Sequence, residues 1–359
     1  IEHVERLGFD EAWVGEHHSG ALEIIGSPEL FIASAAERTR HIRLGTGVVS
    51  LPYHHPFMVA QRITQLDYQT HGRLMFGVGA GSLGSDAHML GTEQKDTRER
   101  LGEALEAVID LFNGKVVSKK TSWFELRDAQ TQLPCLQRPH PELCIASSGS
   151  PSAPRMAGRF GAGLLSLGAT NAAGLKAMAS TWGIWSESAA AHGHTPLRTR
   201  WRISGPVHIA ETREQALSDV RYGIRSWVSY LRQLTPLEIP GGDEVETDVD
   251  AALQAVRDSG LGVIGTPDDL ILKIEDMWAA SGGFGCWLDM APTWADFPAK
   301  LRSYELIAHQ VVPYFRGAQV RRRKSFDWAV ANKASLLGAR RAAIDIEVRK
   351  WEATRKAGA

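Results

Sequence analysis

Short clusters of histidine, aspartate and serine could carry chemistry in this chain. Two pairs of adjacent histidines, His17-His18 and His54-His55, and the carboxylate Asp86 lie within its first quarter. An imidazole changes its charge near neutral pH, so a histidine can act as an acid, a base or a hydrogen-bond donor. Two histidines and one carboxylate could also hold iron, although this spacing matches no metal motif. Since neighbours on a strand point to opposite faces, each pair is expected to turn one ring inward at most.

A serine-rich turn is the second candidate. Ser147-Ser148-Gly149-Ser150-Pro151 follows an apolar run and precedes a helical pattern. Free backbone N–H groups at a helix start can hold an anion such as phosphate. The same residues could equally form an ordinary helix cap. Arg98 or Arg100 could add a guanidinium to the same anion, or each could pair with a surface carboxylate.

Strand-like and helix-like segments alternate along the chain and would position these residues. The predicted strands are short and mostly apolar, as expected of strands buried on both faces: 12–16, 42–49, 74–78, 143–146, 163–167, 204–209 and 286–290. They are separated by helical patterns over 28–40, 57–71, 98–112, 172–192, 212–231, 266–280 and 294–314. Such alternation predicts a parallel sheet covered by helices.

The number of strands favours a closed barrel. Seven strands are visible, and the chain opens at Ile1 directly in a helical pattern. We therefore expect an eighth strand before Ile1 and an α/β fold of the (β/α)₈ TIM barrel type, with functional residues at the carboxyl ends of the strands. An open doubly wound sheet is the alternative. Its phosphate loop would come early, whereas the glycine run at Gly79, Gly81 and Gly84 follows the third visible strand, and we expect no helix directly after it.

Three segments interrupt the alternation. Residues 115–142 have no helical period and are expected to form a hairpin insertion. Residues 234–261 contain proline, glycine and an acidic run, which predicts a long irregular lid loop over the catalytic face. Residues 319–359 are basic and helical and are expected to form a C-terminal extension, so that the barrel would span residues 1–318.

Composition argues against several classes of protein. The formal net charge of -1 gives no general attraction to nucleic acid or anionic membranes. No apolar run approaches the roughly 20 residues of a membrane helix. The three cysteines form no CxxC motif and no secretory leader is visible, which predicts free thiols in a cytoplasmic protein.

A series of short motifs, taken in order, carries a family resemblance. The motifs are 8–13 with 16–18, 44–49 with 51–52 and 55–56, 66–67, 72–74 with 76–79, Gly91, Arg98, 146–150, 157–161 and 265–267. Together they resemble the bacterial luciferase-like family of flavin-dependent monooxygenases, and within it the limonene 1,2-monooxygenase-like branch. The resemblance covers most of the chain before the C-terminal extension.

The resemblance implies roles for individual residues. His17 would be the active-site histidine, with His55 and Asp86 as further catalytic residues. The peptide Gly47–Val48 would lie beneath the flavin ring, where the family often has a cis bond. The flavin phosphate would be bound by Arg98, Ser147, Ser148, Gly149 and Ser150.

The resemblance also implies a reaction. Reduced FMN from a separate flavin reductase would react with O₂ to give a flavin hydroperoxide, which would oxygenate a small apolar, possibly terpene-like substrate. Two copies would pair through the helices at 28–40 and 57–71. A deazaflavin-dependent hydride-transfer oxidoreductase, a non-catalytic flavin-binding barrel and a metal hydrolase barrel remain alternatives.

Some residues depart from luciferase itself. Gly79 stands where luciferase has a reactive cysteine, so light emission is not expected. Ala80 stands where luciferase has a phosphate-binding arginine, and Ser147 replaces an acidic residue. The contacts to phosphate are therefore expected to differ from those in luciferase.

Overall fold

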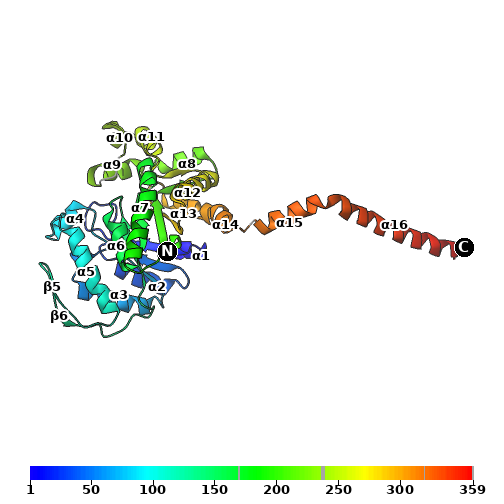
Figure 1. Cartoon of the computed structure of the whole chain (residues 1–359). Helices are drawn as coiled ribbons and strands as arrows, with labels where there is room; N and C mark the ends of the chain where they lie inside the picture. The colour runs from blue at the N-terminus through cyan, green and yellow to red at the C-terminus, as the bar shows by residue number, and fades with distance from the viewer. Residues whose placement is uncertain (169, 236–238, 319, 358–359) are drawn as a thin grey trace. The chain divides into compact units, whose positions relative to one another are not determined.

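The computed structural model describes residues 1–168, 170–235, 239–318 and 320–357. The chain divides into two compact units, Ile1–Ala308 and His309–Ala359 (Figure 1). The first unit holds all the strands of the described chain, and the second is helical. None of the helices in these residues is long and apolar enough to cross a membrane.

A curled parallel sheet forms the centre of the first unit. Its order follows the sequence: β1 (Glu11–Val14), β2 (Arg43–Thr46), β4 (Leu74–Gly79), β7 (Glu142–Ser147), β8 (Gly163–Ser166), β9 (Trp201–Gly205) and β12 (Cys286–Asp289). The short β3 (Val49–Ser50) continues β2 and pairs with β4. A second parallel pair joins β10 (Val207–Ile209) to β11 (Val263–Gly265), and the sequence patterns did not predict β11. The expected α/β class and the luciferase-like barrel type are confirmed, while the strand expected before Ile1 stays a prediction.

Helices follow the strands and cover the sheet (Figure 1). After the short α1 (Glu2–Arg6), the main ones are α2 (Pro28–Arg38), α3 (Pro56–Gln69), α5 (Thr97–Phe112), α6 (Ser152–Phe160), α7 (Ala172–Ala191), α8 (Arg213–Val220), α9 (Ile224–Leu234), α12 (Pro267–Ser281) and α13 (Phe297–Leu306). In α5 the apolar residues recur every three or four positions, and Leu101, Leu105 and Val108 are buried as that period predicts. Because each helix runs back along the sheet, the residues after every strand gather at one edge.

Charged side chains cross the barrel at the opposite, amino-terminal edge. The buried Arg202 on β9 donates two hydrogen bonds of 2.7 Å to Glu11 on β1 and one of 2.9 Å to Glu142 on β7. Arg43 on β2 donates to the second oxygen of Glu142 at 2.7 Å. Burial raises the pKa of Glu142, but Arg202 and Arg43 more than offset it and lower this pKa to about 2. Four strands are thus joined by ionic hydrogen bonds.

The insertion at 115–142 contains the predicted hairpin. Its strands, β5 (Val117–Lys120) and β6 (Glu125–Ala129), pair antiparallel. The buried Phe124 packs edge-on against Trp123 at the turn.

The expectation of an irregular loop at 234–261 is wrong for the described part of that segment. Residues 243–259 contain α10 (Glu244–Thr247) and α11 (Val249–Ser259). Asp248 caps α11 by accepting from the backbone of Asp250 and Ala251, and Gly260 ends it in the left-handed conformation. Apolar residues of α11 are buried in one cluster with those of α9, so the acidic run belongs to exposed faces of packed helices. Residues 236–238 lie outside the described residues.

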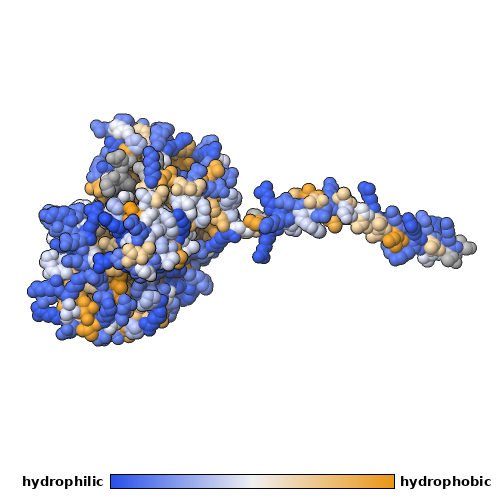
Figure 2. All heavy atoms as spheres, viewed as in Figure 1, coloured by the Kyte–Doolittle hydropathy of each residue, from blue (hydrophilic) through white to orange (hydrophobic). Residues whose placement is uncertain are grey.

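A second expectation also fails. A short helix, α4 (Gly84–Met89), does begin directly after the glycine run and carries Asp86 in its first turn. The segment was too short for a helical period to be visible. The second unit contains α14 (Val312–Phe315), α15 (Val320–Ala331) and α16 (Lys333–Ala357), and hydrophobic and hydrophilic residues alternate along its surface (Figure 2).

Removing one carboxylate from the ionic layer should destabilise the fold. Glu142→Gln leaves the buried Arg202 with Glu11 as its remaining carboxylate, so we expect the free energy of unfolding to fall by about 2–3 kcal/mol. Urea unfolding followed by tryptophan fluorescence would measure this loss. Glu125→Gln is the control, since Glu125 pairs with Arg127 and Lys120 on the exposed hairpin and should leave the midpoint unchanged.

The same comparison should change the dependence on pH. Because folding lowers the pKa of Glu142 from 4.5 to about 2, its stabilising contribution is complete above pH 4.5 and is lost as the pH falls towards 2. Glu142→Gln should therefore lose less stability than the parent protein over that window. Parallel slopes for the two proteins would contradict this role of Glu142.

Candidate active site

The carboxyl ends of β1 and β4 bring together a histidine and a carboxylate that are distant in sequence. His17 follows β1, and its Nδ1 lies 2.9 Å from Oδ2 of Asp86 on α4. The other oxygen of Asp86 accepts from the backbone N–H of His18 at 3.1 Å and from the hydroxyl of Ser19. We call His17, Ser19, Glu23 and Asp86 the His17 cluster.

Asp86 is held as an anion within this cluster. Burial raises its pKa, but the hydrogen bonds from Ser19, His17 and the backbone of His18 outweigh burial, and the net pKa lies below the ordinary value. The buried carboxylate thus fixes both the imidazole of His17 and the backbone that follows β1.

His17 faces a carboxylate on each side. Its Nε2 lies 3.2 Å from Oε2 of Glu23, which is half-exposed, while Nδ1 contacts Asp86. An ionised carboxylate only accepts hydrogen bonds, and a neutral imidazole carries one N–H. Both contacts can therefore be hydrogen bonds only when His17 carries two protons. The ring can hold a proton at Nε2 and release it without losing its bond to Asp86.

Glu16 forms a second cluster beside the first. Its Oε1 accepts from Nε2 of His18 at 2.9 Å and from Nε2 of His54 at 2.7 Å, while Oε2 accepts from the backbone N–H of Ser50 at 2.7 Å. Burial raises the pKa of Glu16, but these hydrogen bonds and the charge of His54 lower it below its ordinary value. We call Glu16, His18, Ser50 and His54 the Glu16 cluster.

Of the second histidine pair, the structure brings His54 to this edge and not His55. The ring of the exposed His55 lies edge-on against Phe124 of the hairpin, with 6.2 Å between ring centres. The 3₁₀ turn η1 (Leu51–Tyr53) follows β3 and rotates the chain, so alternation along a strand no longer applies. For the same reason both His17 and His18, which lie beyond the end of β1 at Val14, are engaged. The expectation of one inward ring per pair therefore fails for His17-His18.

The peptide Gly47–Val48 is cis, as expected from the family resemblance. It lies between β2 and β3, with Gly47 close to β1 and Val48 close to β4. A Cβ on Gly47 would come within 2.9 Å of Cβ of Trp13, and one on Gly79 would come within 2.7 Å of Cγ2 of Val48. Glycine at these two positions lets the backbones approach closely.

The serine turn connects β7 to α6. Ser147 is buried at the end of β7, whereas Ser148 and Gly149 are exposed and Gly149 has a φ of 90°. Ser150 accepts from the backbone N–H of Ser152 at 3.2 Å. Within the part of the chain that the structure describes, the backbone N–H groups of residues 148–150 donate no hydrogen bond. Ser150 thus binds the first residue of α6 from just before its N-cap, Pro151. Whether the turn holds an anion stays a prediction.

Arg98 lies in the first turn of α5. Further along, α5 and α6 approach each other, because a Cβ on Gly102 would contact Met156 at 3.8 Å and Arg159 lies 3.5 Å from Glu106. Arg98 is exposed. Arg100 instead lies over the ring of Trp123, 5.5 Å from its centre.

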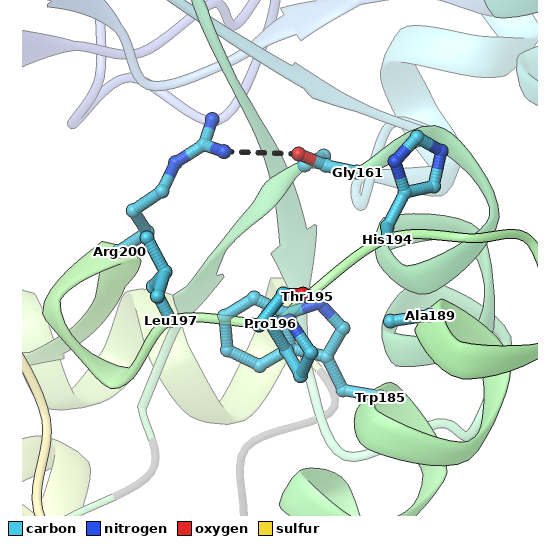
Figure 3. A pocket seen from close by; sticks show the side chains of 9 residues that line it. Gly161, Trp185, Ala189, His194, Thr195, Pro196, Leu197 and Arg200 are labelled. Atoms are coloured by element: carbon cyan, nitrogen blue, oxygen red, sulfur yellow. Dashed lines mark hydrogen bonds between the residues drawn. The ribbon is translucent and has the colours of Figure 1, made fainter.

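The described residues contain no group of three or more His, Cys, Asp or Glu side chains placed to hold a metal ion. One small pocket lies away from both clusters, at the amino-terminal edge near the starts of β8 and β9 (Figure 3). Its cavity volume is about 10 Å³, beside Gly161, Trp185, His194 and Arg200, and Arg200 donates to the carbonyl of Gly161 at 3.0 Å. Ligand sites usually exceed about 300 Å³, so this pocket does not compete with the carboxyl edge.

Comparison with known proteins decides the family. The model of the luciferase-like monooxygenases matches residues 1–284. The chain belongs to this family. It is 42% identical to limonene 1,2-monooxygenase of Rhodococcus erythropolis over 357 residues, covering 99% of this chain and 90% of that protein. It is 44% identical to 4-hydroxyprotoasukamycin monooxygenase of Streptomyces nodosus subsp. asukaensis over 336 residues, covering 93% of this chain and 90% of that protein.

A solved relative has the same fold. The oxygenating constituent of 3,6-diketocamphane monooxygenase from Pseudomonas putida, in complex with FMN, superposes with a TM-score of 0.69 at 26% identity. The match covers 87% of this chain and 91% of that chain. The named relatives of this luciferase-like protein are thus monooxygenases, and the solved one holds FMN.

Sequence analysis of this monooxygenase missed several members of the two clusters. Glu16 was visible only as part of a motif, and Ser19, Glu23 and His54 were not selected. Glu16 did carry a signal, because a carboxylate two residues beyond a buried strand end is costly unless it is hydrogen-bonded. Glu23 carried none, since its contact depends on how the loop after β1 folds back.

Replacing Glu16 should destabilise this monooxygenase. Glu16→Gln replaces one carboxylate oxygen with an NH₂ group, which cannot accept. In one orientation the NH₂ group faces the N–H of Ser50, and in the other it faces the rings of His18 and His54. A buried donor without an acceptor costs about 1–3 kcal/mol, and the free energy of unfolding should fall by that amount. Urea unfolding would measure it, with His55→Gln as the matched control. An equal loss in the exposed control would contradict the assignment of Glu16 to the buried network.

Proposed function

We propose that this protein is the oxygenase of a two-component flavin-dependent monooxygenase, which uses reduced FMN and O₂ to oxygenate a small apolar, possibly terpene-like substrate. The observation that carries the proposal is the His17 cluster at the carboxyl edge, in a chain 42% identical to limonene 1,2-monooxygenase over 99% of its length. A buried anion that orients an imidazole is suited to proton transfer.

The residues at this edge fit a flavin. The N–H groups of residues 148–150 are open at a turn before a helix, which suits a phosphate. Arg98, in the first turn of α5, would add a guanidinium to the phosphate. Gly47 and Gly79 have no side chains, so few atoms project from the backbone around Val48 between β2 and β4. Such a surface suits a flat ring. When bound, reduced flavin supplies the electrons that activate O₂.

His17 would hold a proton for the reaction. Asp86 accepts the Nδ1–H and keeps the ring in one orientation. A proton at Nε2 can then pass to an oxygen atom of the reacting molecules, and Glu23 would stabilise the protonated ring before that transfer. The role of His55 as a catalytic residue is not supported by its exposed position.

Exclusion of water would depend on α9 and on the helices α10 and α11 of the expected lid segment, which pack against it. The loop after β1 carries His17 and Glu23, and a Cβ on its Gly20 would come within 3.0 Å of Tyr230 on α9. Leu22 of the same loop packs against the cluster formed by α9 and α11. Motion of these helices would therefore open or close the site, so the lid role is retained with a helical lid.

A flavin reductase and a second copy of the chain are the proposed protein partners. A separate reductase is proposed because the sequence contains no nicotinamide fingerprint, and the solved relative is named as the oxygenating constituent of its enzyme. Dimerisation through α2 and α3 is supported by exposed apolar side chains on both helices, Leu30 and Phe31 on one and Met58 and Tyr68 on the other.

Oxygen consumption would test the reaction. Protein mixed with reduced FMN and O₂ should consume oxygen, and limonene-like alkenes or cyclic ketones should gain one oxygen atom, seen by mass spectrometry with ¹⁸O₂. A deazaflavin-dependent hydride-transfer enzyme would instead reduce its substrate without oxygen uptake. A flavin-binding barrel without catalysis would bind FMN and form no product.

The phosphate assignment predicts a difference between two flavins. Arg98→Ala should weaken binding of FMN about 10-fold or more, because a charged hydrogen bond is lost, and should leave binding of riboflavin unchanged. Quenching of flavin fluorescence would measure both affinities. Equal weakening of FMN and riboflavin would show that Arg98 acts on the fold and not on the phosphate.

The two predicted histidines should differ sharply. His17→Gln should lower kcat by about 10²–10⁴-fold, as expected for loss of a general acid or base. His55→Gln should change kcat by less than about 3-fold, because the ring of His55 lies against Phe124 outside both clusters. Steady-state product formation measures both values, and similar losses in the two variants would contradict the assignment of His17.

A further inference from the structure

Tyr53 stands next to both clusters but belongs to neither. It ends η1, and its ring lies edge-on to that of His18 with 6.3 Å between the ring centres. The hydroxyl reaches the backbone of Gly81, where an added Cβ would overlap it. Gly81 has a φ of 80°, so the glycine run bends at the point where this hydroxyl needs room.

The Tyr53 hydroxyl is buried and makes no hydrogen bond to any residue that the structure describes. A phenolic O–H removed from water without an acceptor is unfavourable, and nearly all buried polar groups in folded proteins have a partner. The neighbouring carboxylates of Asp86 and Glu16 do not accept from this hydroxyl, and their hydrogen bonds go to other donors.

We propose that Tyr53 is a ligand-binding residue, whose hydroxyl donates a hydrogen bond to an uncharged carbonyl-type oxygen of the molecule bound between the His17 and Glu16 clusters. The inference rests on the proposed function, since it concerns the same site. It restricts the molecule that contacts Tyr53 to one with an oxygen acceptor, because a purely hydrocarbon molecule offers none. The carbonyl belongs either to the flavin ring or to an oxygenated substrate such as a cyclic ketone.

The charges around Tyr53 determine which acceptor fits. Burial, followed by the charges of Asp86 and Glu16, raises the pKa of Tyr53 to about 12. The hydroxyl therefore keeps its proton at physiological pH and can act as a donor. The same two carboxylates repel an anion, so a phosphate is disfavoured at this position and a neutral oxygen is favoured.

Tyr53→Phe tests the inference by removing one oxygen atom. Loss of a neutral hydrogen bond should weaken the bound molecule by about 3- to 10-fold. The Kd of FMN is measured by fluorescence quenching without turnover, and KM and kcat are measured with a cyclic ketone and with limonene. A flavin contact raises the Kd of FMN, whereas a substrate contact raises KM for the ketone and leaves KM for limonene and the Kd of FMN unchanged. Tyr222→Phe, at an exposed tyrosine, is the matched control.

A second pair of variants tests the same hydroxyl by adding a Cβ to a neighbouring glycine. Gly81→Ala and Gly91→Ala both place a side chain at a positive φ, 80° and 66°, and share that strain. Only the Cβ at position 81 meets Tyr53, since nothing lies within 4 Å of one at Gly91. Gly81→Ala should therefore reproduce the binding defect of Tyr53→Phe, and Gly91→Ala should not.

The inference is overturned if Tyr53→Phe keeps the Kd of FMN and the KM for the ketone within 2-fold of the parent protein. It is also overturned if KM rises equally for ketone and limonene while the Kd of FMN is unchanged, because limonene offers no acceptor. Failure of the proposed function would differ from either outcome. In that case the parent protein itself would form no oxygenated product.

Discussion

The buried ionic layer at the amino-terminal edge is the interaction on which the rest of the barrel depends. Arg202 crosses the interior to Glu11 and Glu142, and Arg43 completes the layer. Charges placed in a barrel core are costly unless every hydrogen-bonding position is used, and here each carboxylate meets two or more guanidinium or indole donors. The layer therefore tolerates one arrangement of β1, β2, β7 and β9.

The same strands carry the chemistry at their other ends. Glu11 begins β1, and Glu16 and His17 follow its last residue. Glu142 begins β7, and Ser147 ends it. Because strands are stiff over four to six residues, a shift that repaired a broken ionic layer would also move the site at the opposite edge. The position of the strands would thus link stability to the geometry of the proposed site.

The alternation of strands and helices was predictable because a period of 3.6 or a short apolar run is a property of neighbouring residues. The positions of the site residues were predictable only as far as the strands extend. Beyond Val14 and Ser50 the chain turns. Whether His54 or His55 reaches the site depends on η1, a turn too short to be predicted from any periodicity. The helix α11 is hidden for another reason: the prolines, glycines and acidic run that precede it indicate a loop, although four apolar residues of the helix are buried. The contact of Glu23 with His17 depends on the fold of a loop, and single-sequence patterns hold no record of it.

The two clusters at the carboxyl edge share their hydrogen bonds in opposite ways, and this difference indicates different roles. In the Glu16 cluster one carboxylate accepts from two rings and a backbone N–H, and His54 also faces Arg62 through Nδ1 at 3.4 Å. Glu16 accepts from Nε2 of His54 while Arg62 faces Nδ1, so the ring of His54 is held between these two side chains in one orientation.

In the His17 cluster one ring meets two carboxylates, and one of them, Glu23, is half-exposed on a loop. Moving Glu23 away would break its hydrogen bond to His17, while Asp86 keeps the ring in place. The Glu16 cluster is therefore suited to hold the backbone of β1 and β3 rigid. Under the proposed function the His17 cluster would transfer the proton, and the loop between His17 and Gly26, which packs against α9, would link that transfer to closure of the site.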